Sequence, residues 1–300
     1  MRPRNPADYR TLLWVLIAPA LVAVQFARPE LVKYLWWVSA YFALACGVIA
    51  HNHNHCPTFK GKLQNQIFGN WISIFYGYPT FAWIPTHNLN HHKYVNRAGD
   101  ATITWRYTNR HNLLVALTYF FVSSYWQSDP IKFFIRKAKK ENPPLYRRIL
   151  LQYTIWGGSH LALLALSIAL HGLKTGLYVY VLTLLVPAFF ALWTIMLFNY
   201  CQHVHTDPWS EHDHSRNFEG RVLNFLLFGN GFHTVHHEQP SLHWADAAAA
   251  HGRIRRLIDP RLCEPSMLWF FVRQYLVAPF LPRLGTVQIG RAPFDDRASA

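Results

Sequence analysis

The chain is poor in acidic residues and has no paired cysteines. It has 300 residues, with 15 Asp and Glu against 29 Lys and Arg, and its four Cys form no Cys-x-x-Cys pair. This spacing argues against a disulfide scaffold, a rubredoxin-like site and a cysteine-based zinc site. Only 15% of the residues are charged and 51% are apolar, which excludes an intrinsically disordered protein.

Several motifs of common enzyme classes are also missing. The chain has no His-Glu-x-x-His, which disfavours a zinc protease. It has no Gly-x-Gly-x-x-Gly for a flavin, no haem-binding His-Pro-Gly-Gly and no ferredoxin cysteine pattern. Any redox chemistry would therefore depend on electrons from another protein.

Four apolar runs are present that can cross a membrane as helices. They are Thr11–Ala27, Leu31–Ala50, Ile149–Leu170 and Leu177–Phe198. A spanning helix needs about 20 residues, with about 17 as the short limit, so the first run is marginal and the others are comfortable. Short polar turns separate the first run from the second and the third from the fourth. We therefore expect one all-α membrane domain over residues 1–300, with four transmembrane helices in two hairpins and a helical cap from residues 51–148 and 199–300.

The basic residues predict the orientation of these helices. Three lie in residues 1–10, thirteen in 51–148 and ten in 199–300, whereas three lie in or beside the two short turns. Positive residues collect on the cytoplasmic side, so both termini and the cap are expected there. Topology thus accounts for the net charge of +14. No nucleic-acid-binding motif accompanies it, and we expect no nucleic-acid partner.

Three further stretches are apolar but too short or too interrupted to span a membrane. Ile67–Pro85 and Leu113–Trp126 are rich in aromatic residues, and Pro130–Lys140 mixes Phe and Ile with basic residues. This composition predicts helices that lie in the membrane interface. Leu113–Trp126 is also compatible with a re-entrant hairpin, and residues 289–300 are expected to form a frayed tail.

Thirteen of the 18 histidines fall in four short clusters, all on the predicted cytoplasmic side. The clusters lie within residues 51–55, 87–92, 199–214 and 233–237. Residues three or four apart share one face of a helix, so each cluster can bring nitrogens, or a nitrogen and an amide oxygen, together. Neutral imidazole suits iron, zinc, copper or nickel. Four such clusters at one depth relative to the membrane predict a metal site.

The number of candidate ligands indicates two metal ions. The candidates are His51, His55, His87, His91, His92, Asn199, His203, His233, His236 and His237. One zinc ion takes about four ligands, so these ten fit two metals. A site rich in imidazole and poor in carboxylate at the membrane surface indicates iron that reacts with dioxygen.

The order of these motifs resembles the membrane fatty acid desaturase superfamily over about residues 30–250. The first histidine box of the family corresponds to His51 and His55, the second to His87, His91 and His92, and the third to His233, His236 and His237. The pair Asn199 and His203 is similar to a site of acyl-CoA desaturases where Asn holds a metal through water. The second box departs from the His-x2-His-His of many desaturases, because here it is His-x3-His-His, which is closer to the alkane hydroxylases.

The resemblance implies an O2-dependent enzyme with two iron ions that introduces a double bond into a fatty acyl chain. An acyl or alkane hydroxylase, an oxidative decarboxylase and a carotenoid oxygenase are alternatives on the same scaffold. A ferredoxin or cytochrome b5-type donor with its reductase is the implied partner. The excess of Arg over Lys favours a bacterial inner membrane.

A histidine-rich metal transporter is the alternative outside enzymes. A transporter should place ionisable ligands within its spans, near the bilayer centre. The four predicted spans contain no acidic residue and one mid-segment histidine, His160, while the histidine clusters lie at their ends. This distribution favours the enzyme.

The remaining histidines are expected to play other roles. His53 faces away from His51 and His55 on a helix, and His160 and His171 are expected to be structural. For His205, His212 and His214, support of the ligands and a place at the surface are both open. His243 follows the third box, and a role in orienting that box is open for it. A ligating histidine usually donates its second N–H to a carboxylate or a carbonyl. The acids near enough in sequence are Asp100, Asp207, Glu219, Glu238 and Asp246.

Overall fold

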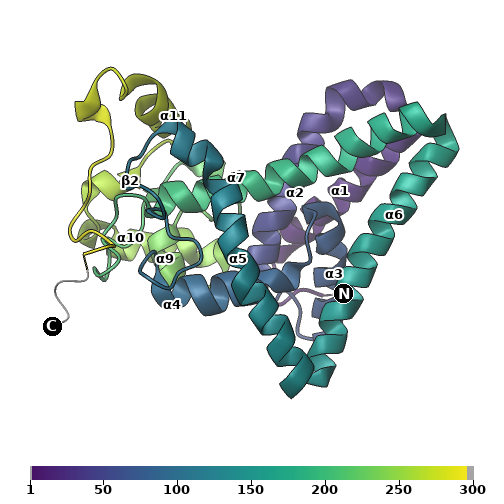
Figure 1. Ribbon diagram of the computed structural model, residues 1–300, viewed down its shortest axis with the longest axis horizontal. Helices are drawn as coiled ribbons and strands as arrows, with labels where there is room; N and C mark the ends of the chain where they lie inside the picture. Colours follow the sequence, from purple (N-terminus) through teal and green to yellow (C-terminus); the bar gives the residue numbers. More distant parts are fainter. Residues whose placement is uncertain (1, 296–300) are drawn as a thin grey trace. The chain divides into compact units, whose positions relative to one another are not determined.

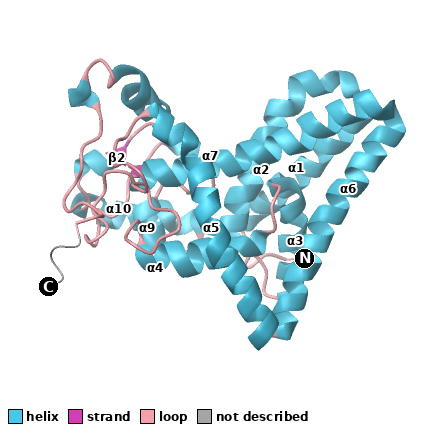
Figure 2. Cartoon of the chain, viewed as in Figure 1, coloured by secondary structure: helices cyan, strands magenta, loops and turns pink. Residues whose placement is uncertain are grey.

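The structure is a computed structural model that describes residues 2–295. The chain divides into two compact units, the first made of residues 1–85 and 131–195 and the second of residues 86–130 and 196–300. Helices make up most of the first unit, whereas the second also contains long loops and short strands (Figure 2). Each unit is described separately below.

The first unit is built from long helices (Figure 1). Its elements are α1 (Asp8–Ala27), η1 (Pro29–Leu31), α2 (Val32–His55), α3 (Lys62–Tyr76), η2 (Thr80–Ala82), the end of α5 (Leu113–Glu141), α6 (Pro143–Tyr180), η4 (Val181–Leu185) and the start of α7 (Val186–His203). Local chemistry sets two of the boundaries. Asn142 caps α6 by accepting a hydrogen bond from the Leu145 N–H, and Pro143 occupies the first helical position. Gly77 ends α3 with a φ of 90°, a conformation that favours glycine.

A sharp turn at Gly172 folds the chain back on itself within the first unit. Gly172 has a φ of 75° and a ψ of 170°, which interrupts the helix. Beyond it, the Gly176 carbonyl accepts a hydrogen bond of 2.9 Å from the Ser167 hydroxyl, and the Tyr180 hydroxyl lies 3.0 Å from His160 Nδ1. The two arms therefore form a helical hairpin.

Three helices among the described residues are long and apolar enough to cross a membrane. They are Asp8–Ala27, Pro29–His55 and Pro143–His203. The third contains both of the last two predicted spans, joined at Gly172. Several large apolar side chains on these helices are more than half exposed, as expected for surfaces in contact with lipid; they include Leu13, Leu16, Trp37, Leu161 and Leu173. These features indicate a membrane protein.

The two apolar stretches after residue 110 are helical, as expected, but they are not separate helices. Leu113–Trp126 and Pro130–Lys140 form one continuous helix, α5, which passes through Pro130. The re-entrant hairpin is therefore wrong.

The second unit holds shorter elements. They are the end of η3 (Ile84–His91), α4 (His92–Tyr94), the start of α5, the end of α7, β1 (Asn217–Phe218), α8 (Arg221–Leu226), α9 (His233–Glu238), η5 (Trp244–Asp246), α10 (Ala247–Ile254), η6 (Arg255–Leu257), η7 (Pro260–Leu262), β2 (Cys263–Glu264), α11 (Met267–Phe271), η8 (Val272–Val277) and η9 (Pro282–Leu284). β1 and β2 pair in parallel, with Asn217 opposite Cys263.

Part of the expected frayed tail is packed against the second unit. Ile289 is buried with Ile258 and Leu262, and its N–H donates to the His205 carbonyl. The expectation of fraying is therefore wrong at this residue, while residues 296–300 lie outside the described part of the chain.

Candidate metal centre

Four histidines of the second unit direct their Nε2 atoms at one another. This four-histidine group consists of His91 at the end of η3, His203 at the end of α7, and His233 and His237 on α9. His203 Nε2 lies 3.1 Å from that of His91, 2.9 Å from that of His233 and 3.2 Å from that of His237. His91 and His203 are almost completely buried.

Hydrogen bonding between His91 and His203 cannot account for the approach of their Nε2 atoms. His203 Nδ1 lies 3.2 Å from the His214 carbonyl, and His91 Nδ1 lies 2.8 Å from the Asp100 carboxylate. Both partners only accept, so in each neutral ring the proton sits on Nδ1 and Nε2 carries a lone pair. Two lone pairs that face each other at 3.1 Å repel unless a cation lies between them.

The separations also fit a metal ion. Two nitrogens at about 2.1 Å from a metal and 90–110° apart are separated by about 3.0–3.4 Å. The Nε2 separations of 2.9–3.2 Å lie at the lower end of this range. The four-histidine group therefore has a donor set and a spacing that suit a metal ion.

A second convergence in the same unit involves the remaining ligands of boxes two and three. The Nε2 atoms of this three-histidine group, His87, His92 and His236, lie 3.0–3.1 Å from one another. His87 lies in η3, a π-helix, and His92 is the first residue of α4 directly after it. Residues five apart lie near one face of a π-helix, which favours the approach of these two rings. Both boxes are thus divided between two groups: His91, His233 and His237 join one, and His87, His92 and His236 join the other.

Asp100 holds His91 in place. The carboxylate is buried and accepts hydrogen bonds from His91 Nδ1, the Asn96 N–H and the Thr102 N–H and hydroxyl, at 2.7–2.8 Å. Burial alone would raise the pKa of Asp100, but His91 and the hydrogen bonds of Thr102 outweigh it and lower the pKa. Asp100 therefore stays ionised and directs the lone pair of His91 towards the other histidines.

The loop after box two connects Asp100 to α7. Asn96 adopts a left-handed φ of 64°, which asparagine tolerates, and its side chain donates to the His203 carbonyl at 2.9 Å. Tyr119 on α5 donates to the Thr102 carbonyl and accepts from the Asn199 amide at 2.9 Å. This is the interaction that the structure gives for Asn199, whose role as a ligand stays a prediction.

Burial keeps the imidazole of His237 neutral. Desolvation and the neighbouring His92 and His233 lower the pKa of His237 well below its ordinary value. A neutral imidazole is the form that binds a metal ion, so no proton must be removed near neutral pH before a metal is bound.

The first histidine box lies in the first unit. α2 continues five residues beyond the predicted end of the span, so His51 and His55 lie one turn apart on the same helix, with ring centroids 5.0 Å apart. His53 points elsewhere, because its Nδ1 lies 3.0 Å from the Thr58 hydroxyl and its Nε2 lies 3.3 Å from the Asn65 carbonyl. His53 therefore stabilises the loop after α2.

The histidines whose roles were open have different partners. His205 lies 2.7 Å from the Asn109 carbonyl and 3.0 Å from the Thr286 hydroxyl, and His212 lies 2.8 Å from Glu238. His214 is buried beside His237, with ring centroids 5.4 Å apart, and burial lowers its pKa to about 4. His243 caps η5. In the first unit, His160 and His171 each lie within 3.0 Å of a backbone carbonyl, as a structural role requires.

The acids near the histidine clusters also differ in their contacts. Asp100 contacts a predicted ligand, whereas Glu219 pairs with His251 and Arg255, and Asp207 binds backbone N–H groups of the loops. The chain contains a Glu-x-x-His spacing, Glu211 to His214, but it lies in a loop. It therefore lacks the helical setting in which soluble di-iron bundles use this motif.

Sequence reasoning missed Thr102, Asn96 and Tyr119. Each supports the four-histidine group through hydrogen bonds that form only after the loop has folded. The spacing of these residues carries no periodic signal, and Tyr119 lies in a stretch that resembles an interfacial helix. A sequence pattern therefore could not identify them.

Comparison with known proteins agrees with this geometry. The family model described as fatty acid desaturase matches residues 31–271, which include every histidine of both groups. No curated protein and no solved structure matches the chain significantly. Because the match covers most of the chain, the protein belongs to the fatty acid desaturase family of oxidoreductases, which are typically metal-dependent.

Proposed function

We propose that the protein is a membrane fatty acyl desaturase that uses two iron ions and dioxygen. The observation that carries the proposal is the convergence of seven imidazole Nε2 atoms into two groups, each with separations of about 3 Å. Family membership supports the reaction class, and the apolar helices support a substrate that resides in the membrane.

The ligands in this proposal are those of the three histidine boxes with Asn199 and His203. The four-histidine group would hold one iron, and the three-histidine group would contribute to the other. His51 and His55 are included because they match the first box of the family and lie on one face of α2. Iron, when bound, supplies the activation of dioxygen that removal of hydrogen from an unactivated C–H bond requires.

The protein's own residues orient and enclose this centre. Asp100 fixes the tautomer of His91, and Asn96 holds the end of α7 that carries His203. Burial of His91, His203 and His233 excludes water from the four-histidine group. Electrons would come from a ferredoxin or a cytochrome b5-type protein with its reductase.

The proposed topology follows from the distribution of basic residues. Both termini and the histidine-bearing segments would lie in the cytoplasm, with four spans arranged as two hairpins in a bacterial inner membrane. A reporter enzyme that is active only in the cytoplasm, fused to either terminus, should be active. Inactivity of both fusions would contradict this orientation.

The function is tested by expression with a ferredoxin and its reductase and by profiling total lipids with gas chromatography–mass spectrometry. New double bonds in acyl chains are expected from the unaltered protein and not from His236→Ala. His171→Gln is the matched control, since His171 hydrogen-bonds to the Phe26 carbonyl and belongs to no histidine box. It should retain both activity and iron.

The products distinguish the alternatives. Hydroxylated chains or alkanols would indicate a hydroxylase, for which the His-x3-His-His form of the second box is the supporting feature. Terminal alkenes would indicate oxidative decarboxylation, and altered carotenoids would indicate a carotenoid oxygenase. Vectorial metal uptake into vesicles without any oxidised product would instead support a transporter.

A further inference from the structure

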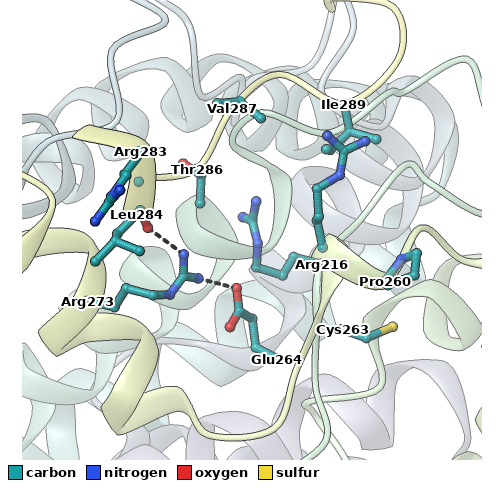
Figure 3. Close-up of a pocket in the computed structure, with 12 residues that line it drawn as sticks. Arg216, Pro260, Cys263, Glu264, Arg273, Arg283, Leu284, Thr286, Val287 and Ile289 are labelled. Atoms are coloured by element: carbon teal, nitrogen blue, oxygen red, sulfur yellow. Dashed lines mark hydrogen bonds and ion pairs between the residues drawn. The ribbon is translucent and has the colours of Figure 1, made fainter. Parts of the chain in front are cut away.

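A cavity lined by arginines lies in the second unit, formed by other residues than the histidine groups. Its volume is about 370 Å³, and four arginines line it together with Glu264. The arginines are Arg216 just before β1, Arg261 in η7, Arg273 in η8 and Arg283 in η9. Figure 3 shows side chains from these separate segments gathered around the cavity, with Arg273 bridging Glu264 and the Leu284 carbonyl.

The positive charge of this cavity exceeds its negative charge. Arg261 is paired with Asp259, and Arg273 donates to Glu264 at 2.5 Å. Within residues 2–295, neither Arg216 nor Arg283 forms a salt bridge. The cavity therefore has room and unbalanced charge for an anion.

Arg216 is the strongest indication that an anion belongs there. Its side chain is 1% exposed, its Nη1 donates to the Cys201 and Val204 carbonyls, and its guanidinium lies 5.3 Å from the centroid of the Phe270 ring. Its buried Nε has no hydrogen-bond partner among the described residues. Burying a charged group is costly. Glu264 attracts Arg216 but is already paired with Arg273, so a bound anion would lower the cost that remains.

The chemistry of the lining suits an oxyanion such as a phosphate group. Several guanidinium groups around one cavity match the oxygens of a phosphate, which accept paired hydrogen bonds from arginine. The segment that carries Arg273 also exposes large apolar side chains. These are Leu268, Trp269, Leu276 and Phe280, each more than half exposed.

We propose that this cavity binds the phosphate of a phospholipid headgroup, with the exposed apolar side chains of residues 268–280 against the lipid chains. Basic pockets at the membrane surface bind phospholipid headgroups in this manner. A soluble organic phosphate shares the chemistry of the headgroup but lacks the apolar part. The inference is independent of the reaction catalysed at the histidine groups.

The site would also support the end of α7. The Arg216 N–H donates to the Gln202 carbonyl at 2.7 Å, beside His203. A lipid bound to Arg216 would therefore stabilise the backbone at the end of α7 that carries His203. Added lipid should raise the apparent melting temperature of the protein.

The test uses the purified full chain in detergent and native mass spectrometry. Phosphatidylglycerol is titrated in one series, glycerol 3-phosphate in a second and phosphate-free diacylglycerol in a third. Arg283→Gln removes an exposed cation without breaking a hydrogen bond that the structure gives, and it should weaken phosphatidylglycerol binding about tenfold or more. Arg256→Gln, at an exposed arginine outside the cavity lining, is the matched control and should bind like the unaltered protein.

The series distinguish the sources of the phosphate. Binding of phosphatidylglycerol alone supports the lipid site, and equal binding of glycerol 3-phosphate shows a phosphate site that ignores the lipid chains, which overturns the lipid assignment. Three results would overturn the phosphate site. Diacylglycerol could bind as tightly as phosphatidylglycerol, Arg283→Gln could bind phosphatidylglycerol as tightly as the unaltered protein, or no lipid could bind saturably. A melting temperature of Arg283→Gln equal to that of Arg256→Gln shows that the variant is folded.

Discussion

At the scale of single residues, Asp100 controls the four-histidine group without belonging to it. Its carboxylate accepts a hydrogen bond from the Nδ1–H of His91, so Asp100→Asn replaces an acceptor with an amide that can also donate. The iron affinity or the activity of the variant should be about 10–100-fold lower than that of the unaltered protein, which is the usual effect of removing such a hydrogen-bond partner. Iron content and product yield, measured on the purified protein, test this.

The control for this prediction is a carboxylate outside the histidine groups. Asp259→Asn removes the exposed ion pair to Arg261 and should leave the iron content unchanged. Normal iron affinity in Asp100→Asn would show that His91 does not depend on the carboxylate. A protein that no longer folds would be recognised from its loss of helical circular dichroism, and Asp100→Glu would then replace it.

The residues of the histidine boxes could be identified from the sequence. Apolar residues recur at helical spacing in any packed helix, whereas histidines that recur at this spacing beside a membrane indicate a shared ligand. The support of these histidines could not be read in the same way. Asp100 was one of five candidate acids, and only the folded loop with Asn96 and Thr102 brings it to His91. Contacts between residues that are not related by helix or strand periodicity form only in the tertiary structure.

At the scale of helices, the hairpin at Gly172 depends on a close approach at Gly176. A Cβ added at Gly176 would lie 2.5 Å from Ile168 Cα, a backbone atom that cannot move alone. Gly176→Ala should therefore separate the two arms and cost about 2 kcal/mol or more. Thermal unfolding in detergent measures the change, and an unaltered melting temperature would contradict the close packing of the arms.

Gly158→Ala is the matched control on the same helix. A Cβ at Gly158 meets no atom within 4 Å, and alanine favours a helix by about 1 kcal/mol over glycine. This variant should be as stable as the unaltered protein or more so. The comparison separates the effect of packing from the general effect of replacing glycine.

Hydrophobic runs located the long helices correctly but could not define how they continue. α2 extends through the polar residues of the first box because backbone hydrogen bonding persists beyond the apolar stretch. α5 passes through Pro130, although proline usually interrupts a helix. The π-helix at Ile84–His91 has no simple sequence signature, so the division of box two between two groups was not foreseen.

At the scale of the whole molecule, the proposed iron would link segments that are distant in sequence. The four-histidine group joins residues 91, 203, 233 and 237, all within the second unit. Removing the metal would leave the lone pairs of His91 and His203 facing each other at 3.1 Å, which opposes the folded arrangement. The second unit should then open locally more often.

Hydrogen–deuterium exchange of the iron-loaded and the chelated protein measures this effect. Amide exchange should accelerate in residues 86–104 and in α9, because both segments carry histidines of the two groups. Exchange in α1 should stay unchanged, since α1 contains no histidine and serves as an internal control. Equal protection of α9 in both samples would mean that the four-histidine group is stable without a metal, and the lone-pair argument for iron at this position would fail.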